Sequence, residues 1–201
     1  MKAFTLLHAK AMPLALANVD TDQIIPARYL GLERVNQVDA LFRDLRFCPR
    51  GELIGSFPMN QERFLGAKVL VAYRNFGCGS SRENAVSTLL DNGFECIIAP
   101  SFGDIFYNNC FQNGVLPIVI DEQRVMKLID LLTNDRSLMI DIDLYHQSVG
   151  FPDGSIEHFE IDGFRKDCLL KGLDAIDLTL SYASEIEAYE RDQFIERQWQ
   201  P

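Results

Sequence analysis

Short apolar runs and helix-like spacings alternate along the middle of this chain. β-Prone apolar runs occupy residues 67–73, 96–99 and 116–120, with turn residues close by. Runs of this length and composition are typical of buried strands. A further strand is predicted near the N-terminus, over residues 3–7. These four runs are the candidate strands of a sheet.

Helical patterns fill the gaps between these runs. Residues 81–92 have the pattern of a helix. Ser101 is a good N-cap for a second helix that continues to about Asn113, with Gly114 as its stop. Residues 122–132 place four apolar side chains on one helical face: Val125, Leu128, Ile129 and Leu132. Strand and helix therefore alternate, which predicts an α/β fold with a mixed, partly parallel sheet and covering helices.

The last third of the chain changes character. Three short strands are predicted at residues 138–143, 146–150 and 155–161, and their close spacing favours antiparallel or mixed pairing. Asp162 is a candidate N-cap for a short helix that ends before Gly172. A final amphipathic helix is predicted near residues 184–198.

The chain length and one irregular segment bound the domain organisation. The 201 residues, 47% of them hydrophobic, suffice for one sizeable core, so residues 1–201 are expected to form one domain. Residues 28–62 show weak periodicity, scattered arginines and turn residues. A long, partly irregular excursion is expected there, and such loops in compact domains are often functional.

Charge is distributed unevenly. The net charge is −10; residues 1–120 hold 11 acidic and 11 basic residues, so all the excess acid lies in residues 121–201. This sign disfavours nucleic acid as a partner. No run reaches the 18 or so apolar residues that a membrane span needs, and the first residues make a poor signal peptide. We therefore expect a cytoplasmic protein with no membrane partner.

The cysteines and histidines form no metal-binding pattern. The five cysteines are odd in number and include no C-x-x-C pair, which argues against a disulfide framework, a zinc ribbon or a self-contained iron–sulfur site. Cys96 and Cys110 lie in apolar surroundings and are expected in the core. The three histidines have no ligand spacing. No metal is expected on this chain.

The most chemically informative segment joins a predicted strand to a predicted helix, with the sequence RNFGCGSSRENA over residues 74–85. The first turn of a helix has unpartnered N–H groups and a partial positive charge, and the glycines permit close backbone approach. Together these features predict a carboxylate or phosphate site. Arg82 can grip a carboxylate through two N–H groups. A dinucleotide fingerprint needs glycine where Arg82 stands, and a P-loop needs a G-K-[ST] sequence that is absent.

A purely structural interpretation of the same residues is also open. Ser80 and Glu83 fit the capping-box pattern S-x-x-E. A catalytic interpretation makes Ser80 a base whose alkoxide is stabilised by the helix terminus and the neighbouring cation. A nucleophilic serine would instead need a histidine base, and no histidine is near in sequence.

Several segments in order resemble one family. Residues 75–83, together with NVDTDQIIP at 18–26, APSFGDIF at 99–106, GVLP at 114–117 and GLD at 172–174, resemble the small swivelling β/β/α domain of the aconitase superfamily. The closest resemblance within it is to the small subunits of 3-isopropylmalate dehydratases. It covers nearly the whole chain, and several motifs in the right order are far more specific than any one alone.

The resemblance implies a chemistry and a division of labour. Members of the family remove water from a hydroxy acid and add it back at another position, in leucine biosynthesis for the isopropylmalate enzymes. A [4Fe–4S] cluster acts as the Lewis acid, and it lies in a separate aconitase-type large subunit. The resemblance implies that Ser80 is the base, that Asp22 lies near the active site, and that the small hydroxy-dicarboxylic acid is bound by four residues: Gly79, Ser81, Arg82 and Arg28.

Substrate choice is where the chain departs from the family. The family uses a loop corresponding to residues 29–36 to select the substrate side chain, and bacterial members commonly carry Arg-Thr-Gly there; this chain has Arg34-Val35-Asn36. The family commonly has histidine where this chain has Asn84. Two alternatives therefore stand beside an isopropylmalate enzyme. One is a related hydro-lyase acting on a dimethylmalate, citramalate or homoaconitate type of acid, and the other is a non-catalytic carboxylate-binding module.

Overall fold

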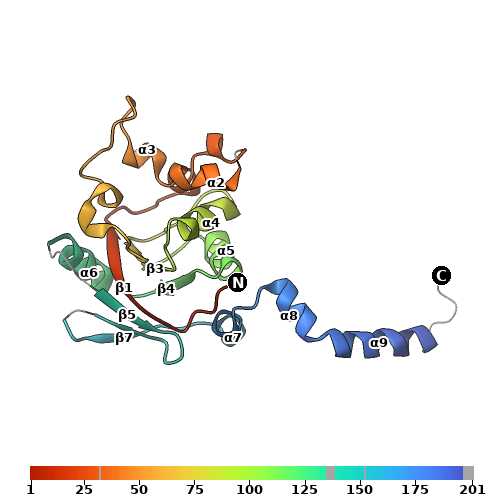
Figure 1. Cartoon of the computed structure of the whole chain (residues 1–201). Helices are drawn as coiled ribbons and strands as arrows, with labels where there is room; N and C mark the ends of the chain where they lie inside the picture. The colour runs from red at the N-terminus through yellow and green to blue at the C-terminus, as the bar shows by residue number, and fades with distance from the viewer. Residues whose placement is uncertain (32, 135–138, 152, 197–201) are drawn as a thin grey trace.

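A single seven-stranded sheet organises the molecule (Figure 1). The computed structural model describes residues 1–31, 33–134, 139–151 and 153–196. The strand order is β4-β3-β2-β1-β5-β6-β7. The strands are β1 (Leu6–Leu14), β2 (Val69–Ala72), β3 (Cys96–Ala99), β4 (Leu116–Val119), β5 (Met139–Asp143), β6 (Ser148–Gly150) and β7 (Ile156–His158).

The two halves of the sheet differ in direction. Strands β1 to β4 run parallel, and β5 to β7 add antiparallel strands on the other side of β1. The parallel half arises because a helix separates β2 from β3 and β3 from β4, and parallel neighbours need such crossovers. The antiparallel half joins through short turns. The predicted α/β fold with a mixed, partly parallel sheet is confirmed.

The first strand is longer and later than residues 3–7. It runs over Leu6–Leu14, pairing with β5 over residues 6–10 and with β2 over residues 11–14. The prediction of residues 3–7 was wrong at both ends, because the strand starts at Leu6 and continues through Pro13, a residue that is uncommon inside strands. Pro13 is tolerated here since β5 has already ended its pairing at Lys10, so the missing N–H faces no partner strand.

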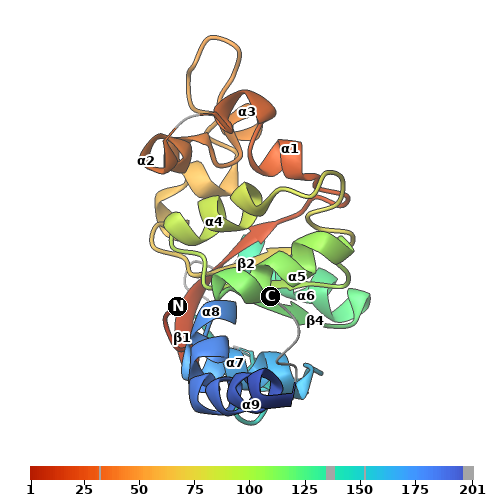
Figure 2. The same ribbon diagram turned by 90° about the vertical axis from the view of Figure 1, so that its right-hand side faces the viewer.

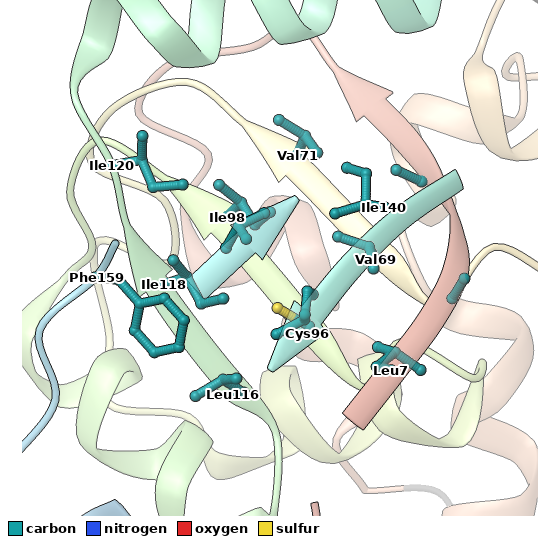
Figure 3. Close-up of a cluster of buried hydrophobic side chains, with 14 of the residues drawn as sticks. Leu7, Val69, Val71, Cys96, Ile98, Leu116, Ile118, Ile120, Ile140 and Phe159 are labelled. Carbon is teal, nitrogen blue, oxygen red and sulfur yellow. The ribbon is translucent and has the colours of Figure 1, made fainter. Parts of the chain in front are cut away.

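Helices cover both faces of the sheet, which gives two cores. The helices α4 (Glu83–Asp91) and α5 (Asp104–Asn113) lie side by side on one face (Figure 2), and α6 (Glu122–Asn134) covers the other. Successive apolar residues along each strand point to opposite faces of the sheet, so they pack alternately into one core and the other. Figure 3 shows the core on the α6 face, where Val69, Cys96 and Ile98 pack together.

Most, but not all, of the predicted caps and stops of α5 and α7 (Gly163–Lys171) are present in the structure. Asp162 caps α7 by accepting from the Arg165 N–H at 3.1 Å, and Gly172 ends α7 in the left-handed region. Gly114 ends α5 in the same way. The predicted N-cap Ser101 was wrong, because α5 begins at Asp104 with Gly103 as its N-cap. The Ser101 hydroxyl is used elsewhere, as an acceptor for the Asn75 N–H.

The connection between β1 and β2, which contains the excursion predicted over residues 28–62, is built from single turns, and the weak periodicity of residues 28–62 predicted this irregular structure. In order these are α1 (Thr21–Ile24), η1 (Ala27–Tyr29), α2 (Arg34–Gln37), η2 (Val38–Ala40), α3 (Arg43–Arg46), η3 (Pro58–Asn60) and η4 (Glu62–Phe64). Buried side chains such as Leu41, Phe42 and Phe57 fix it to the α4 face of the sheet. Ring centroids of Phe42 and Phe57 lie 5.8 Å apart. Segments without long helices thus pack as part of the core.

Two helices at the C-terminal end project away from the body (Figure 1). These are α8 (Ala175–Ser181) and α9 (Ala183–Glu196), and every side chain of residues 183–192 is exposed. We call α8 and α9 the C-terminal arm. The predicted helix at 184–198 corresponds to α9, with its last two residues outside the described ones. Among the described residues, no helix is long and apolar enough to span a membrane.

Candidate active site

Three loops meet beyond the carboxyl ends of the parallel strands β1, β2 and β3. The Gly77 N–H donates to the Val19 carbonyl at 2.7 Å, and the Gly103 N–H donates to the Phe76 carbonyl at 2.9 Å. The first contact joins the loop after β1 to the loop after β2, and the second joins the loop after β2 to the loop after β3. This edge of an open α/β sheet is where ligands characteristically bind. The sheet thereby brings the NVDTD segment and the glycine–serine turn together.

The glycines in this turn are required by packing. Gly77 has φ +72°, and a Cβ placed there would overlap the Phe106 ring. A Cβ on Gly103 would lie 2.5 Å from the Gly77 carbonyl oxygen. Gly79, a predicted binding residue, has φ +89° and is exposed. The left-handed backbone at Gly77 and Gly79 favours glycine and sets the path of the chain toward the serines.

The predicted capping box between Ser80 and Glu83 is wrong. Helix α4 begins at Glu83, and its N-cap is Arg82, without a side-chain cap bond. The Ser80 carbonyl instead accepts from the Thr21 hydroxyl at 3.0 Å and from the Arg82 N–H at 2.9 Å. These two bonds turn the chain before the helix starts, so Ser80 lies two residues ahead of the cap.

Both serine hydroxyls remain available for chemistry. Ser80 and Ser81 are exposed, and within the described parts of the chain neither hydroxyl makes a hydrogen bond. Thr21, which holds the Ser80 backbone, is 1% exposed. Sequence reasoning did not single out Thr21, although it lies inside the NVDTD segment. Its buried hydroxyl donates to the Ser80 carbonyl and so ties the backbone of the serine turn to α1.

Arg82 and Asp22 form a two-point ion pair. Nη1 of Arg82 donates to Oδ1 of Asp22, and Nη2 donates to Oδ2 at 2.8 Å. The Arg82 side chain is 16% exposed and that of Asp22 54%. Asp22 also accepts from the Ala27 N–H at 3.1 Å. The arginine hydrogen bond lowers the pKa of Asp22, and Asp22 in turn raises the pKa of Arg82.

This pairing occupies only one edge of the Arg82 guanidinium. A guanidinium carries five N–H donors. Asp22 takes one from each terminal nitrogen, and the Ile25 carbonyl lies 3.5 Å from Nη1. Within the described residues no acceptor is bonded to Nε of Arg82. The Nε–Nη2 edge therefore retains two donors suited to a second carboxylate.

Arg28, another predicted binding residue, is engaged elsewhere. Its guanidinium makes a two-point ion pair with Asp44 and lies 4.9 Å from the Tyr29 ring centroid. The Asp44 hydrogen bond raises the pKa of Arg28 and lowers that of Asp44. The structure therefore brings Asp22, Gly79, Ser80, Ser81 and Arg82 together, while Arg28 belongs to the excursion.

The histidines lie on the other half of the sheet. His8 pairs with Asp141, His146 pairs with Asp143, and His158 ends β7. A histidine-activated serine therefore has no support within the described chain. Cys96 and Cys110 are fully buried, as predicted, and burial raises the pKa of both thiols far above the usual value. Among the described residues no three His, Cys, Asp or Glu side chains gather in a way that could hold a metal ion.

Comparisons with known proteins give a consistent set of similarities. The aconitase C-terminal domain family matches residues 1–123. The 3-isopropylmalate dehydratase small subunit of Phenylobacterium zucineum is 48% identical over 200 residues, which covers 99% of this chain and 98% of that protein. The protein of the same name from Saccharophagus degradans is 47% identical over 209 residues, covering 99% and 97%. The crystal structure of 3-isopropylmalate dehydratase from Methanocaldococcus jannaschii has a TM-score of 0.66 at 26% identity, covering 92% of this chain and 99% of that one.

Proposed function

This chain belongs to the family of 3-isopropylmalate dehydratase small subunits, and we propose on that basis that it is half of a hydro-lyase that interconverts 2-isopropylmalate and 3-isopropylmalate in leucine biosynthesis. The reaction removes water from one isomer and returns it at the neighbouring carbon. The observation that carries the proposal is that one turn beyond the carboxyl ends of the parallel strands presents an exposed Ser80 hydroxyl and, two residues later, an arginine that Asp22 holds by two hydrogen bonds.

Arg82 and Ser81 are assigned to the substrate carboxylate. Two parallel N–H groups match the two oxygens of a carboxylate, and this geometry gives both strength and orientation. Asp22 holds the opposite edge of Arg82, so the guanidinium is aimed before substrate arrives. Gly79 and Arg28 are also assigned to substrate binding. Gly79 would contribute through its exposed backbone. Arg28 lies in the excursion, where it pairs with Asp44.

Ser80 is assigned as the base. Its oxygen, as the alkoxide, takes the proton from the carbon beside the carboxylate and becomes a hydroxyl. The electron pair of that C–H bond forms the double bond as the C–O bond on the adjacent carbon breaks. The departing hydroxide takes a proton from solvent to become water, and Ser80 returns its proton to solvent, so the step releases one water molecule. Arg82, two residues away in the same hydrogen-bonded turn, is assigned the role of stabilising negative charge on Ser80. Rehydration reverses these steps with the hydroxyl on the other carbon.

The Lewis acid is assigned to a partner. An aconitase-type large subunit carrying a [4Fe–4S] cluster would polarise the leaving hydroxyl, and the described residues of this chain do not fit such a cluster because they gather no metal-binding group. The word small subunit in the names of the relatives supports a heteromeric enzyme. The proposal takes residues 1–201 as one swivelling domain. It also places the protein in the cytoplasm, which the five free cysteines favour.

Reconstitution tests this proposal. The full chain, mixed with its large subunit, is expected to convert 2-isopropylmalate to 3-isopropylmalate, while neither subunit alone does so. Replacing the base by Ser80→Ala should lower kcat by about 10²–10⁴-fold. Ser81→Ala should act mainly on KM. Ser56 is exposed and outside the site, so Ser56→Ala is the control and should leave both constants unchanged.

The substrate panel separates the alternatives. Dimethylmalate, citramalate and homocitrate-type acids are assayed beside isopropylmalate with the same complex. Faster turnover of one of these would assign the related hydro-lyase instead. Carboxylate binding without turnover in any complex would leave a binding module. Full activity of the Ser80→Ala complex would remove Ser80 as the base.

A further inference from the structure

The C-terminal arm carries a concentration of exposed apolar side chains. Within residues 176–189, five large apolar side chains are at least 39% exposed: Ile176, Leu180, Tyr182, Ile186 and Tyr189. The last three have the i, i+4, i+7 spacing that places side chains on one face of a helix. The other exposed large apolar side chains of the described residues are scattered over the body. A group of this kind, left in water, is characteristic of an interaction surface.

Helix α9 lacks the packing that normally stabilises a helix of its length. It has 14 residues, and isolated helices shorter than about 12–15 residues are only marginally stable in water. Every side chain of residues 183–192 is exposed, so this part of α9 buries no apolar face against the body. A partner that covers Ile186 and Tyr189 would supply the missing burial.

The arm is anchored firmly where it leaves the body. The Phe4 N–H, just before β1, donates to the Leu169 carbonyl of α7 at 2.9 Å. Asp174 then caps α8, since its side chain accepts from the Ile176 and Asp177 N–H groups at 2.9 and 2.8 Å. These contacts set the direction in which the arm projects from the body (Figures 1 and 2).

The candidate active site lies at the opposite end of β1 from this anchor. The anchor adjoins the residues that precede β1, whereas Asp22, Ser80 and Arg82 lie beyond the carboxyl ends of the parallel strands. Strand β1 has nine residues, and at about 3.3 Å per residue it separates the two ends by about 26 Å. A protein domain of ordinary size spans this distance. One partner can therefore contact the arm and the site at separate places.

Charge defines the chemistry of the occupant. Residues 175–196, which form the two arm helices, hold six acidic side chains and one basic side chain. An apolar stripe with an acidic rim is complementary to an apolar groove whose rim carries Lys and Arg. The same charge disfavours an anionic membrane surface, which attracts basic helices.

A second copy of this chain does not offer a groove of that charge. Residues 1–120 have no net charge, and residues 121–201 carry the whole −10. Four arginines of the body already pair with carboxylates of their own chain: Arg28, Arg34, Arg74 and Arg82. Two arms side by side would place acid against acid, which is unfavourable. The charge distribution therefore favours a different protein as the partner.

We propose that the C-terminal arm docks in an apolar, basic-rimmed groove of the large subunit, as a second contact remote from the active site. This inference rests on the proposed function for the identity of the partner. The similarity to small subunits covers 99% of this chain and so extends over the described arm. Two contacts with one partner reinforce each other, because forming the first makes the second intramolecular. The arm thus raises the affinity between subunits and takes no part in the chemistry.

Binding of the full chain to the purified large subunit tests this role. The double variant Ile186→Ser, Tyr189→Ser should raise the Kd about tenfold or more, as truncation of buried interface side chains does. At saturating small subunit, kcat should stay within about twofold of wild type, because the arm is remote from Ser80 and Arg82. Ile156→Ser is the matched control, since Ile156 on β7 is 65% exposed and Tyr189 is 66% exposed. This control should leave the Kd unchanged.

Salt tests the charge argument separately. Raising the salt concentration from about 0.05 to 0.5 M screens exposed charges, so the wild-type Kd should rise. The triple variant Glu185→Gln, Glu187→Gln, Glu190→Gln should show a smaller rise, because it has lost acidic side chains of the arm. An equal rise in both proteins would contradict the charge complementarity on which the choice of partner depends.

Hydrogen exchange provides a measurement that needs neither a variant nor activity. The Ile186 N–H donates to the Tyr182 carbonyl at 2.9 Å, and in the isolated chain this amide should exchange rapidly because α9 is unsupported. Addition of the large subunit should slow its exchange at least about tenfold. The Val125 amide, which bonds the Asp121 carbonyl at the start of α6, is the internal control and should not change.

The outcomes separate this inference from the proposed function. A Kd that does not change in the Ile186→Ser, Tyr189→Ser variant, or that rises equally in Ile156→Ser, would overturn the docking role. So would unchanged exchange of the Ile186 amide in the complex. A dimer of the isolated chain that this double variant disperses would assign the arm to a second copy instead. Arm-dependent binding without turnover of any substituted malate would remove the proposed function and leave the docking role supported.

Discussion

The Asp22–Arg82 ion pair makes the sharpest prediction, because the structure allows opposite outcomes for it. If Asp22 aims Arg82, removing its charge should weaken substrate binding. If Asp22 merely competes with substrate for the guanidinium, removing its charge should tighten binding. Asn is the matched replacement, since Asp22→Asn keeps one acceptor oxygen and the side-chain shape. It replaces the other acceptor with a donor that faces Arg82.

The size of the effect follows from the exposure of the pair. Asp22 is 54% exposed and Arg82 16%, so water screens the carboxylate partly. Exposed ion pairs have an interaction free energy of about 0.2–1 kcal/mol. The two-point geometry of Asp22 and Arg82 places their pair at the upper end of that range. A loss of about 1 kcal/mol in substrate binding corresponds to a rise in KM of about fivefold. The kcat should change less, because Ser80 is held by Thr21 and not by Asp22.

The assay compares the reconstituted Asp22→Asn enzyme with wild type and with a matched control. Asp153→Asn is the control: Asp153 accepts from Arg124, whose side chain is 18% exposed, and Asp153 itself is 41% exposed. That pair lies on the α6 face, away from the site. A fivefold rise in KM for Asp22→Asn alone supports the aiming role. A lower KM for Asp22→Asn, or an equal rise in both variants, would refute it.

Three further predictions concern stability. Arg82 lowers the pKa of Asp22 in the folded state. The ionised Asp22 therefore stabilises the fold at neutral pH, and this contribution is lost as the pH falls below about 4. In denaturant titrations, the unfolding free energies of wild type and Asp22→Asn should converge there. Gly77→Ala places a methyl group in the Phe106 ring at a positive φ and should lower Tm by more than about 10 °C, whereas Gly51→Ala, also at positive φ but in open space, should cost only about 1 kcal/mol. Deleting residues 183–201 should leave the Tm of the body within about 2 °C in calorimetry, because the described side chains of 183–192 are exposed; a larger drop would contradict that reading.

The sequence by itself determined the order of the elements and the chemistry of one segment. Helix ends and buried strands depend on residues that are close in sequence, so they could be predicted. Asp162 caps a helix, Gly114 and Gly172 end helices, and apolar runs form buried strands. The glycine–serine turn was likewise identified locally, because two glycines, two serines and an arginine stand close together in residues 77–82. Motif order along the chain identified the family, which the comparisons confirm.

Only the tertiary structure decided what these residues contact. Asp22 and Arg82 are 60 residues apart, and Asn84 and Gln37, whose side chains share a hydrogen bond, are 47 apart, so no local pattern pairs them. The capping-box pattern at Ser80 was locally convincing and failed because a distant side chain, that of Thr21, bonds the Ser80 carbonyl and delays the helix start. Side-chain partners depend on how the sheet brings loops together, since hydrogen bonds and ion pairs act over a few ångströms whatever the separation along the chain. The sequence therefore specifies the groups that do the chemistry, and the fold specifies which of them meet.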